Sequence, residues 1–180
     1  MNHAFNPWHK VPIGADAPRI VKAIIEIPKG SKGKYELDKE TGLLNLNRVL
    51  FSAVHYPANY GLIPQTYYLD NDPLDILVLC SIDLVPLSTL DARVIGMMRM
   101  KDENGPDEKI ISVAQYDSAL EHINDLKDLP KHALDELKRF FLDYKILENR
   151  KVEVGEFMGR EMAYECIDMS VKLYNEKCKK

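Results

Sequence analysis

The sequence predicts an α+β fold in which helices pack outside a mainly antiparallel sheet or small barrel. Segments in the first two thirds of the chain alternate apolar and polar residues and end near proline or glycine. The last third instead repeats apolar residues at helical spacing. Strands followed by helices are typical of α+β proteins. The length of 180 residues is typical of one domain, which we expect to span residues 1–180.

The first third of the chain is expected to hold an arm and several strands. Residues 1–18 carry three prolines and little periodicity, so we expect an extended N-terminal arm that lies on the domain. Alternating apolar and polar residues predict strands over residues 20–27, 34–37 and 43–50. The aromatic segment at 55–61 is expected to be irregular.

The middle of the chain predicts further strands around an acidic loop. Residues 76–80 are apolar throughout, which indicates a buried strand. Residues 93–100 and 109–113 are expected to pair on either side of the loop at 102–108. The Asn104–Gly105 step in that loop favours a hairpin turn.

The last third predicts two or three helices. Ser118 and Glu121 have the spacing of a capping box before a short helix. Pro130 suits the first turn of a longer helix. On that helix, apolar residues recur at helical spacing at Leu134, Leu137, Phe141, Tyr144 and Leu147. A final helix is predicted over roughly residues 160–174.

Composition and charge disfavour several classes of protein. With 46% hydrophobic and 29% charged residues, the chain is typical of soluble globular proteins and not of disordered ones. The net charge of −4 disfavours binding of duplex nucleic acid through a basic face. No apolar run is long enough for a signal peptide or a membrane span. Three cysteines (Cys80, Cys166 and Cys178) form no CxxC pair, so we expect a reducing, cytoplasmic compartment.

The most informative stretch is LDNDPLDILVL, residues 69–79. Asp70, Asp72 and Asp75 fall within six residues, and no lysine or arginine lies between Tyr56 and Pro86. If these carboxylates converged at ~5 Å, each pair would repel by roughly 3 kcal/mol at an effective dielectric of about 20. A convergent, ionised trio therefore needs cations.

This stretch has two other interpretations. On spacing alone, an acidic turn with all three side chains in solvent is favoured, because Asp, Asn and Pro are common turn residues. A calcium loop of the EF-hand type is excluded. Counted from Asp70, the sixth position is Asp75 instead of glycine, and the twelfth is Ser81.

A second acidic cluster comprises Asp102, Glu103, Asp107 and Glu108. On local evidence a solvated hairpin turn is favoured here too. If the two clusters met in space, they would line a pocket with carboxylate oxygens and without sulfur or imidazole. Such a pocket suits magnesium or manganese better than zinc or copper.

Candidate anion-binding groups are the cations Lys34, Arg48 and Lys145 and the tyrosines Tyr56, Tyr60 and Tyr144. Taken singly, each lysine is best interpreted as a surface charge, and Tyr144 as a core residue. Arg48 shares a predicted strand face with leucines, so it must extend to solvent, pair with an acid or point into a polar cavity. Together with the acids, these groups fit a phosphate held among hard cations.

At these residues the chain resembles the soluble, magnesium-dependent inorganic pyrophosphatases of the barrel type (family I), in their short bacterial and plant-like form. The similarity runs from about residue 18 to about residue 174. It rests on the acidic motif DNDPLD (70–75) and on further segments in the same order: IEIPKGSKGKYELDKETG (25–42), NRVLFSAVHYPANYGLIPQT (47–66), KDENGPDEK (101–109) and RFFLDYK (139–145).

The resemblance implies a role for each site residue. Metal ligands are implied at Asp70, Asp75, Asp102, Asp107 and Glu36. Substrate-binding groups are implied at Lys34, Arg48, Tyr60, Tyr144 and Lys145. Asp72 is implied as the general base, with supporting residues at Glu26, Tyr56 and Lys109.

The resemblance also implies a fold, a reaction and an assembly. The fold would be a five-stranded OB-type barrel, and residues 1–180 would form a single catalytic domain. The reaction would be hydrolysis of pyrophosphate to two orthophosphates by in-line attack of a metal-activated water, with no covalent intermediate. Several Mg²⁺ ions per site are expected, with Mn²⁺ as a possible substitute. A cytoplasmic homohexamer is expected, without nucleic-acid or membrane partners.

Two rival functions stay open at this point. An OB-type module for single-stranded nucleic acid would need a basic groove with stacking aromatic residues, which the acidic loops disfavour. A metal-dependent phosphodiesterase or nucleotidase would use the same kinds of ligand.

Overall fold

The computed structural model describes residues 5–103 and 105–178. In chain order its elements are α1 (Pro7–Lys10), β1 (Ile20–Ile27), β2 (Gly33–Leu37), β3 (Leu44–Val49), β4 (Asn59–Leu62), β5 (Asp75–Leu79), β6 (Thr89–Asp102), β7 (Gly105–Pro106), β8 (Lys109–Ala114), the 3₁₀ turns η1 (Ser118–Leu120) and η2 (Leu126–Asp128), α2 (Lys131–Asp143), the 3₁₀ turn η3 (Ile146–Glu148), β9 (Glu153–Gly159) and α3 (Arg160–Cys178).

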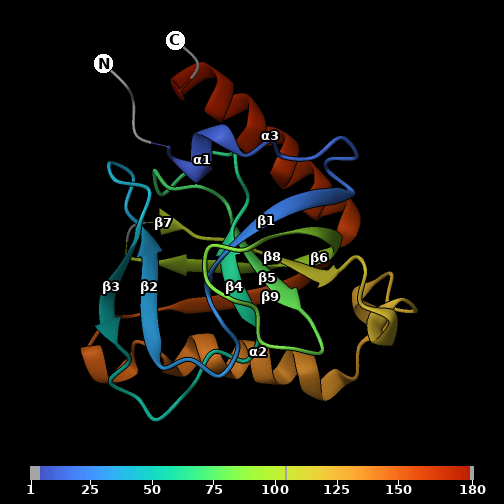
Figure 1. Cartoon of the computed structure of the whole chain (residues 1–180). Coiled ribbons are helices and arrows are strands. Elements are labelled where there is room, and N and C mark those ends of the chain that lie inside the picture. The colour runs from blue at the N-terminus through green and yellow to red at the C-terminus, as the bar shows by residue number, and fades with distance from the viewer. Residues whose placement is uncertain (1–4, 104, 179–180) are drawn as a thin grey trace.

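A mixed sheet whose strand pairings run in a ring forms the centre of the structure. Strand β1 pairs with β4 and β6, β4 pairs with β5, and β8 pairs with both β5 and β6. The β5–β8 pair is parallel, whereas the other pairs of the ring are antiparallel. Strand β9 pairs with β6, and β2 and β3 form a separate hairpin beside the ring (Figure 1).

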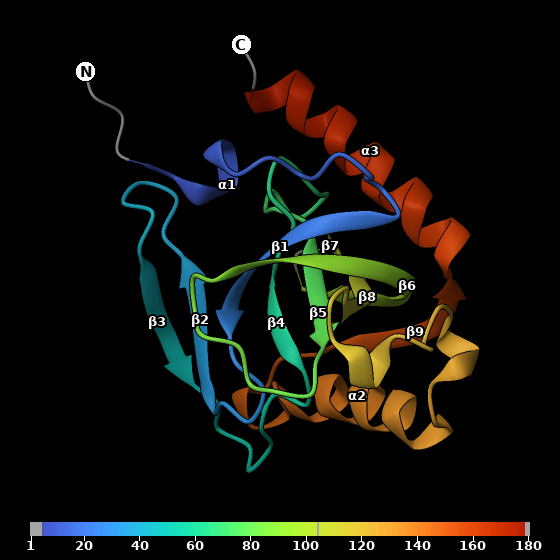
Figure 2. The same ribbon diagram turned by 45° about the vertical axis from the view of Figure 1, so that its right-hand side comes forward.

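Side chains on the two faces of the ring strands pack in two different apolar clusters, because successive side chains of a strand point to opposite faces. On β5, Leu77 packs in the cluster that contains Phe141 of α2. Its neighbours Ile76 and Val78 pack in the cluster that contains Ile167 of α3. Helices α2 and α3 accordingly lie on opposite sides of the strands (Figures 1 and 2). Fully burying one such side chain contributes about 1.5–3 kcal/mol.

Most predicted elements are confirmed, with the strand at 20–27 matching β1 and the pairing around the acidic loop matching β6 with β8. At that loop, β6 and β7 pair Asp102 with Gly105, while Asn104 of the predicted turn lies outside the described residues.

The prediction of an irregular segment at 55–61 holds for 55–58 but is wrong from residue 59, because Asn59–Leu62 forms β4 between β1 and β5. Every residue of β4 is buried, so the strand shows no alternation that could reveal it. A Cβ on Gly61 would lie 1.9 Å from the carbonyl oxygen of Ile24, so only glycine permits this close pairing. Strand β9 was also not predicted.

Three predictions about the helical segments and the arm need correction. Asp117, and not Ser118, caps the short turn η1, since its side chain accepts from the amide of Ala119. Helix α2 ends at Asp143, so Leu147 lies beyond it and is 62% exposed. The N-terminal arm is not extended throughout, because α1 forms within it around the buried Trp8.

Within the described ranges, no helix combines the length and the apolar character that crossing a bilayer requires.

Candidate active site

One cavity of about 390 Å³ lies between the β2–β3 hairpin and the ring. Residues of β4, β5, β6, β8 and the end of α2 also line it. Each site residue predicted from the sequence lines it: Glu26, Lys34, Glu36, Arg48, Tyr56, Tyr60, Asp70, Asp72, Asp75, Asp102, Asp107, Lys109, Tyr144 and Lys145. The two acidic clusters therefore meet in space, and the alternative of two separate solvated turns does not hold.

Local backbone bonds shape the turn that carries the first acidic cluster. The Tyr68 amide donates to the carbonyl oxygen of Asp72 at 2.7 Å, and the Asp72 amide donates to the Asp70 carboxylate at 3.1 Å. Asn71 has φ of 70°, a left-handed conformation that asparagine tolerates better than most residues. The motif therefore folds as a tight turn that ends at Asp75, the first residue of β5.

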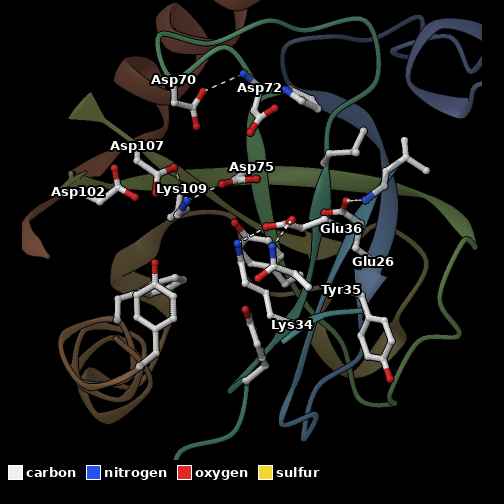
Figure 3. Close-up of a pocket in the computed structure, with 18 of the residues that line it drawn as sticks. Glu26, Lys34, Tyr35, Glu36, Asp70, Asp72, Asp75, Asp102, Asp107 and Lys109 are labelled. Carbon is white, nitrogen blue, oxygen red and sulfur yellow. Dashed lines mark hydrogen bonds and ion pairs between the residues drawn. The ribbon is translucent and has the colours of Figure 1, made fainter. Parts of the chain in front are cut away.

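The parallel pairing of β5 and β8 brings the second cluster to the first. The register places Asp75 opposite Lys109, so Asp107 lies just beyond the paired end of β8. The Asp107 amide donates to the carbonyl oxygen of Met100 at 2.9 Å, which ties this segment to β6. Asp102 ends β6 on the same side of the cavity (Figure 3).

Lys109 lies between two of the carboxylates. Its ammonium pairs with both Asp75 and Asp107, and the residue is only 2% exposed (Figure 3). Burial alone would lower the pKa of Lys109, but Asp107 and then Asp75 raise it well above its usual value. Lys109 is therefore charged and offsets part of the repulsion between the two acids.

Asp70 has no such counter-charge. Among the described residues no lysine or arginine forms an ion pair with its carboxylate, which accepts only the backbone bond from Asp72. Burial, together with Asp75 and Asp107, raises the pKa of Asp70 to about 7. An additional cation at this place would reverse that shift.

Glu26 and Glu36 occupy contrasting environments on the hairpin side of the cavity. Glu26 is buried and accepts the Leu37 amide at 2.6 Å, and burial raises its pKa to about 8. Burial acts in the same direction on Glu36, but the ion pair with Lys34 lowers its pKa below the usual value. Glu36 is therefore ionised, whereas the site as it stands favours the neutral form of Glu26.

Arg48 lines the cavity and has one donor without a partner among the described residues. Its Nε donates to Glu148 at 2.8 Å and its Nη1 donates to Asn47 at 2.9 Å. Its Nη2 is buried and has no hydrogen-bond partner among the described residues. A buried donor without a partner is costly, so this nitrogen is suited to an anionic oxygen in the cavity.

Lysine and tyrosine side chains complete the polar lining. Lys145 pairs with Asp102 at 2.8 Å, and both groups are nearly buried. Burial raises the pKa values of Tyr56, Tyr60 and Tyr144, so their hydroxyls stay protonated at neutral pH. They can therefore donate hydrogen bonds to an oxyanion.

Sequence reasoning missed several residues that line the site, among them Lys39 and Trp8. Lys39, from the turn after β2, pairs with Asp72, and Trp8 of α1 lines the same cavity. The Lys39 ammonium also lies 5.6 Å from the centre of the Trp8 ring system. A lysine in a polar turn gives no local signal of such a contact, since its partner lies 33 positions away.

The donor set fits a hard divalent cation. As the side chains stand, no three acidic, histidine or cysteine groups within residues 5–103 and 105–178 are arranged to ligate one ion. Glu36 and the aspartates other than Asp70 are instead paired with lysines. The charged oxygen ligands that line the cavity are carboxylates, and no histidine or cysteine is among its described lining residues. Magnesium and manganese prefer such oxygen ligands.

Carboxylates and cations that surround one cavity define a class of hydrolytic sites in which divalent ions and basic side chains hold a phosphate-type anion. A family model described as inorganic pyrophosphatase matches residues 23–175. The chain belongs to the inorganic pyrophosphatase family.

Known relatives agree in both sequence and structure. The chain is 50% identical over 173 residues to soluble inorganic pyrophosphatase 3 of Arabidopsis thaliana, covering 96% of this chain and 80% of that protein. It is 50% identical over 171 residues to the soluble inorganic pyrophosphatase of Zea mays, covering 95% and 80%. The crystal structure of the inorganic pyrophosphatase from Thermus thermophilus superposes with a TM-score of 0.92 at 39% identity, covering 95% of this chain and 99% of that one.

Proposed function

We propose that this protein is an inorganic diphosphatase that hydrolyses pyrophosphate to two orthophosphates. Membership of the family, at about half identity to named pyrophosphatases, supports this activity. The observation that carries the proposal is the convergence of both acidic segments with Lys34, Arg48 and Lys145 on one cavity.

The proposed cofactor is Mg²⁺, several ions per site, with Mn²⁺ as a possible substitute. Carboxylates would hold these ions, and the proposed ligands are Asp70, Asp75, Asp102, Asp107 and Glu36. When bound, the ions would lower the pKa of water toward ~7 and neutralise charge on the substrate. Asp70 is suited to this role because it has no cationic partner in the described chain.

The basic and phenolic groups are proposed to bind the substrate. They are Lys34, Arg48, Tyr60, Tyr144 and Lys145, and Glu26, Tyr56 and Lys109 support them. The free Nη2 of Arg48 supports this role, since a phosphoryl oxygen would satisfy it. These donors would also stabilise the charge that gathers on the leaving phosphate.

Asp72 is proposed as the general base. Its side chain is 54% exposed at the cavity, so water can reach it. It would accept a proton from the attacking water or orient that water for in-line attack on one phosphorus, with no covalent intermediate. Lys39 forms an ion pair with it at the edge of the cavity.

For the architecture, we propose a single catalytic domain whose ring of strands is an OB-type barrel. Around the ring, the strands follow one another in the order β1, β4, β5, β8, β6 and back to β1. If the five strands are numbered by their place in the chain, this order is 1-2-3-5-4-1. That cyclic order in a five-stranded mixed sheet supports the OB assignment.

A cytoplasmic homohexamer is also proposed. The exposed apolar residues Leu46, Val49 and Phe51 on and after β3 are suited to burial between copies of the chain. Sedimentation velocity of the full chain tests the assembly, and a monomer would contradict it.

Phosphate release from pyrophosphate, with Mg²⁺ and with excess chelator, tests the function. The proposal requires release that depends on the metal and far exceeds release from ATP or a phosphodiester. Equal rates on all three substrates would favour a broader phosphohydrolase. A titration with a single-stranded oligonucleotide at several salt concentrations tests the rival function of a nucleic-acid binding module. Tight binding that weakens with salt would support that rival function.

A further inference from the structure

The two acidic segments of the site are joined by a hydrogen bond that lies outside the cavity lining. The Tyr68 hydroxyl donates to Oε2 of Glu108, across 40 positions of sequence. Tyr68 precedes Asp70 by two residues, and Glu108 directly follows Asp107. Neither Tyr68 nor Glu108 is among the residues that line the cavity.

Tyr68 is firmly held at its own end. The residue is 6% exposed and packs in one cluster with Leu74, Ile110 and Cys166 of α3. Just before it, the Tyr67 amide donates to the carbonyl oxygen of Ser170 at 3.0 Å. Helix α3 and the core therefore fix the start of the acidic turn.

Tyr68 also holds the turn that carries Asp70 and Asp72. Its amide donates to the carbonyl oxygen of Asp72 at 2.7 Å, and its carbonyl oxygen accepts the Asn71 amide at 3.1 Å. A shift of Tyr68 would move both aspartates. Because burial and the bond to Glu108 raise the pKa of Tyr68 far above its usual value, the hydroxyl remains a donor across the working pH range.

No ion pair of the described chain holds Asp70 to the Asp107 segment, so the Tyr68–Glu108 hydrogen bond has a role there. Lys109 already joins Asp75 to Asp107, but no lysine or arginine of the described chain pairs with Asp70. Without metal, Asp70 faces Asp75 and Asp107, whose charges Lys109 offsets only in part, and burial with these two acids raises the pKa of Asp70 to about 7. Repulsion of this kind would push the turn away from β8 unless another contact held it.

We propose that Tyr68 and Glu108 are a positioning pair that sets the separation of Asp70 and Asp107 before any ion binds, and thereby sets the affinity of the protein for Mg²⁺. This rests on the metal-binding part of the proposed function. The pair touches neither substrate nor ion. It acts through the backbone, as groups behind metal ligands commonly do.

The test compares Tyr68→Phe, Glu108→Ala and Glu108→Gln with the wild-type chain. Calorimetric titration of the metal-free proteins with Mg²⁺ gives the affinity, and phosphate release at rising free Mg²⁺ gives the concentration for half-maximal rate. Tyr68→Phe and Glu108→Ala are expected to weaken Mg²⁺ binding by about tenfold, with kcat at saturating Mg²⁺ within about twofold of wild type.

The conservative variant separates the hydrogen bond from the charge. Glutamine can still accept from the Tyr68 hydroxyl, so Glu108→Gln is expected to stay within about threefold of wild-type affinity. The double variant Tyr68→Phe/Glu108→Ala is expected to be no weaker than Glu108→Ala alone, because both changes remove one bond.

A matched control is Tyr174→Phe, which removes a hydroxyl bonded to His9 at 2.7 Å and far along α3. It is expected to change thermal stability but not the affinity for Mg²⁺. Wild-type affinity in Tyr68→Phe, or fully additive losses in the double variant, would overturn the proposal. Failure of the wild-type chain to hydrolyse pyrophosphate would instead contradict the proposed function and leave the affinity comparison intact.

Discussion

Asp72 differs from the other aspartates of the site in its surroundings. It is the half-exposed acid of the motif and is paired with Lys39 from the hairpin, whereas Asp75 and Asp107 share the buried Lys109. A base must exchange protons with water, and the exposure of Asp72 allows this exchange. The buried acids are better suited to hold cations.

Asp72→Asn is expected to lower kcat by at least about 100-fold, because the amide cannot accept the proton that a general base removes. Fold and Mg²⁺ affinity should remain close to wild type, since Asp72 is not among the proposed metal ligands. Rates of phosphate release, measured beside a calorimetric Mg²⁺ titration, check this. An unchanged rate would remove Asp72 from the role of base.

Glu26 gives a prediction about pH. Burial raises its pKa to about 8, so the folded chain holds this proton more tightly than the unfolded chain, where the pKa is near 4.5. The contribution of Glu26 to stability is therefore greatest below that unfolded value and is lost as pH rises toward 8. Chemical denaturation of metal-free protein from pH 5 to pH 8 should show this decline, and Glu26→Gln should flatten it. An equal decline in the variant would assign the effect to other groups.

At the scale of elements, the close pairing of β1 with β4 holds Tyr60 against the cavity. Gly61 permits this pairing because its missing side chain leaves room for the carbonyl oxygen of Ile24. The two strands belong to the ring that also carries Asp75 and Lys109. Separating β1 from β4 would therefore disturb the site as well as the core.

Gly61→Ala is expected to destabilise the protein by about 2 kcal/mol or more, because a Cβ would meet backbone at 1.9 Å. Gly159→Ala is the matched control, since nothing lies within 4 Å of its added Cβ. Urea unfolding of both variants measures the difference. Equal midpoints for Gly61→Ala and wild type would show that β1 and β4 can move apart at little cost.

The sequence predicted the elements that have one exposed and one buried face, because such elements show a regular pattern of apolar and polar residues. Strand β1 and helix α2 belong to this group. Strand β4 escaped prediction because it is buried along its whole length, and β9, with an irregular exposure pattern, forms because β6 offers it an edge. The site residues were identified through the family resemblance, because on spacing alone both acidic segments were best interpreted as solvated turns. The partners of the site residues could not be predicted from the local sequence, because they lie up to 100 positions away, as Glu148 does from Arg48.

At the scale of the whole molecule, the ring and the hairpin bring four distant parts of the chain to one cavity. The hairpin contributes Lys34 and Arg48, and the turn before β5 contributes Asp70 and Asp72. The β6–β8 connection contributes Asp102, Glu103 and Asp107. Lys145, just after α2, completes the set. Cations gathered by these acids would let a polyanion enter a protein whose own net charge is negative.

The central claim is that carboxylates from separate segments hold divalent ions at the place where pyrophosphate reacts. A crystal structure of the protein with Mn²⁺, analysed by anomalous scattering, measures this most directly. The account predicts anomalous peaks in the cavity within coordination distance of Asp70, Asp75 and Asp107. An anomalous map with no peak in this cavity, or with Mn²⁺ peaks only elsewhere on the molecule, would contradict the account.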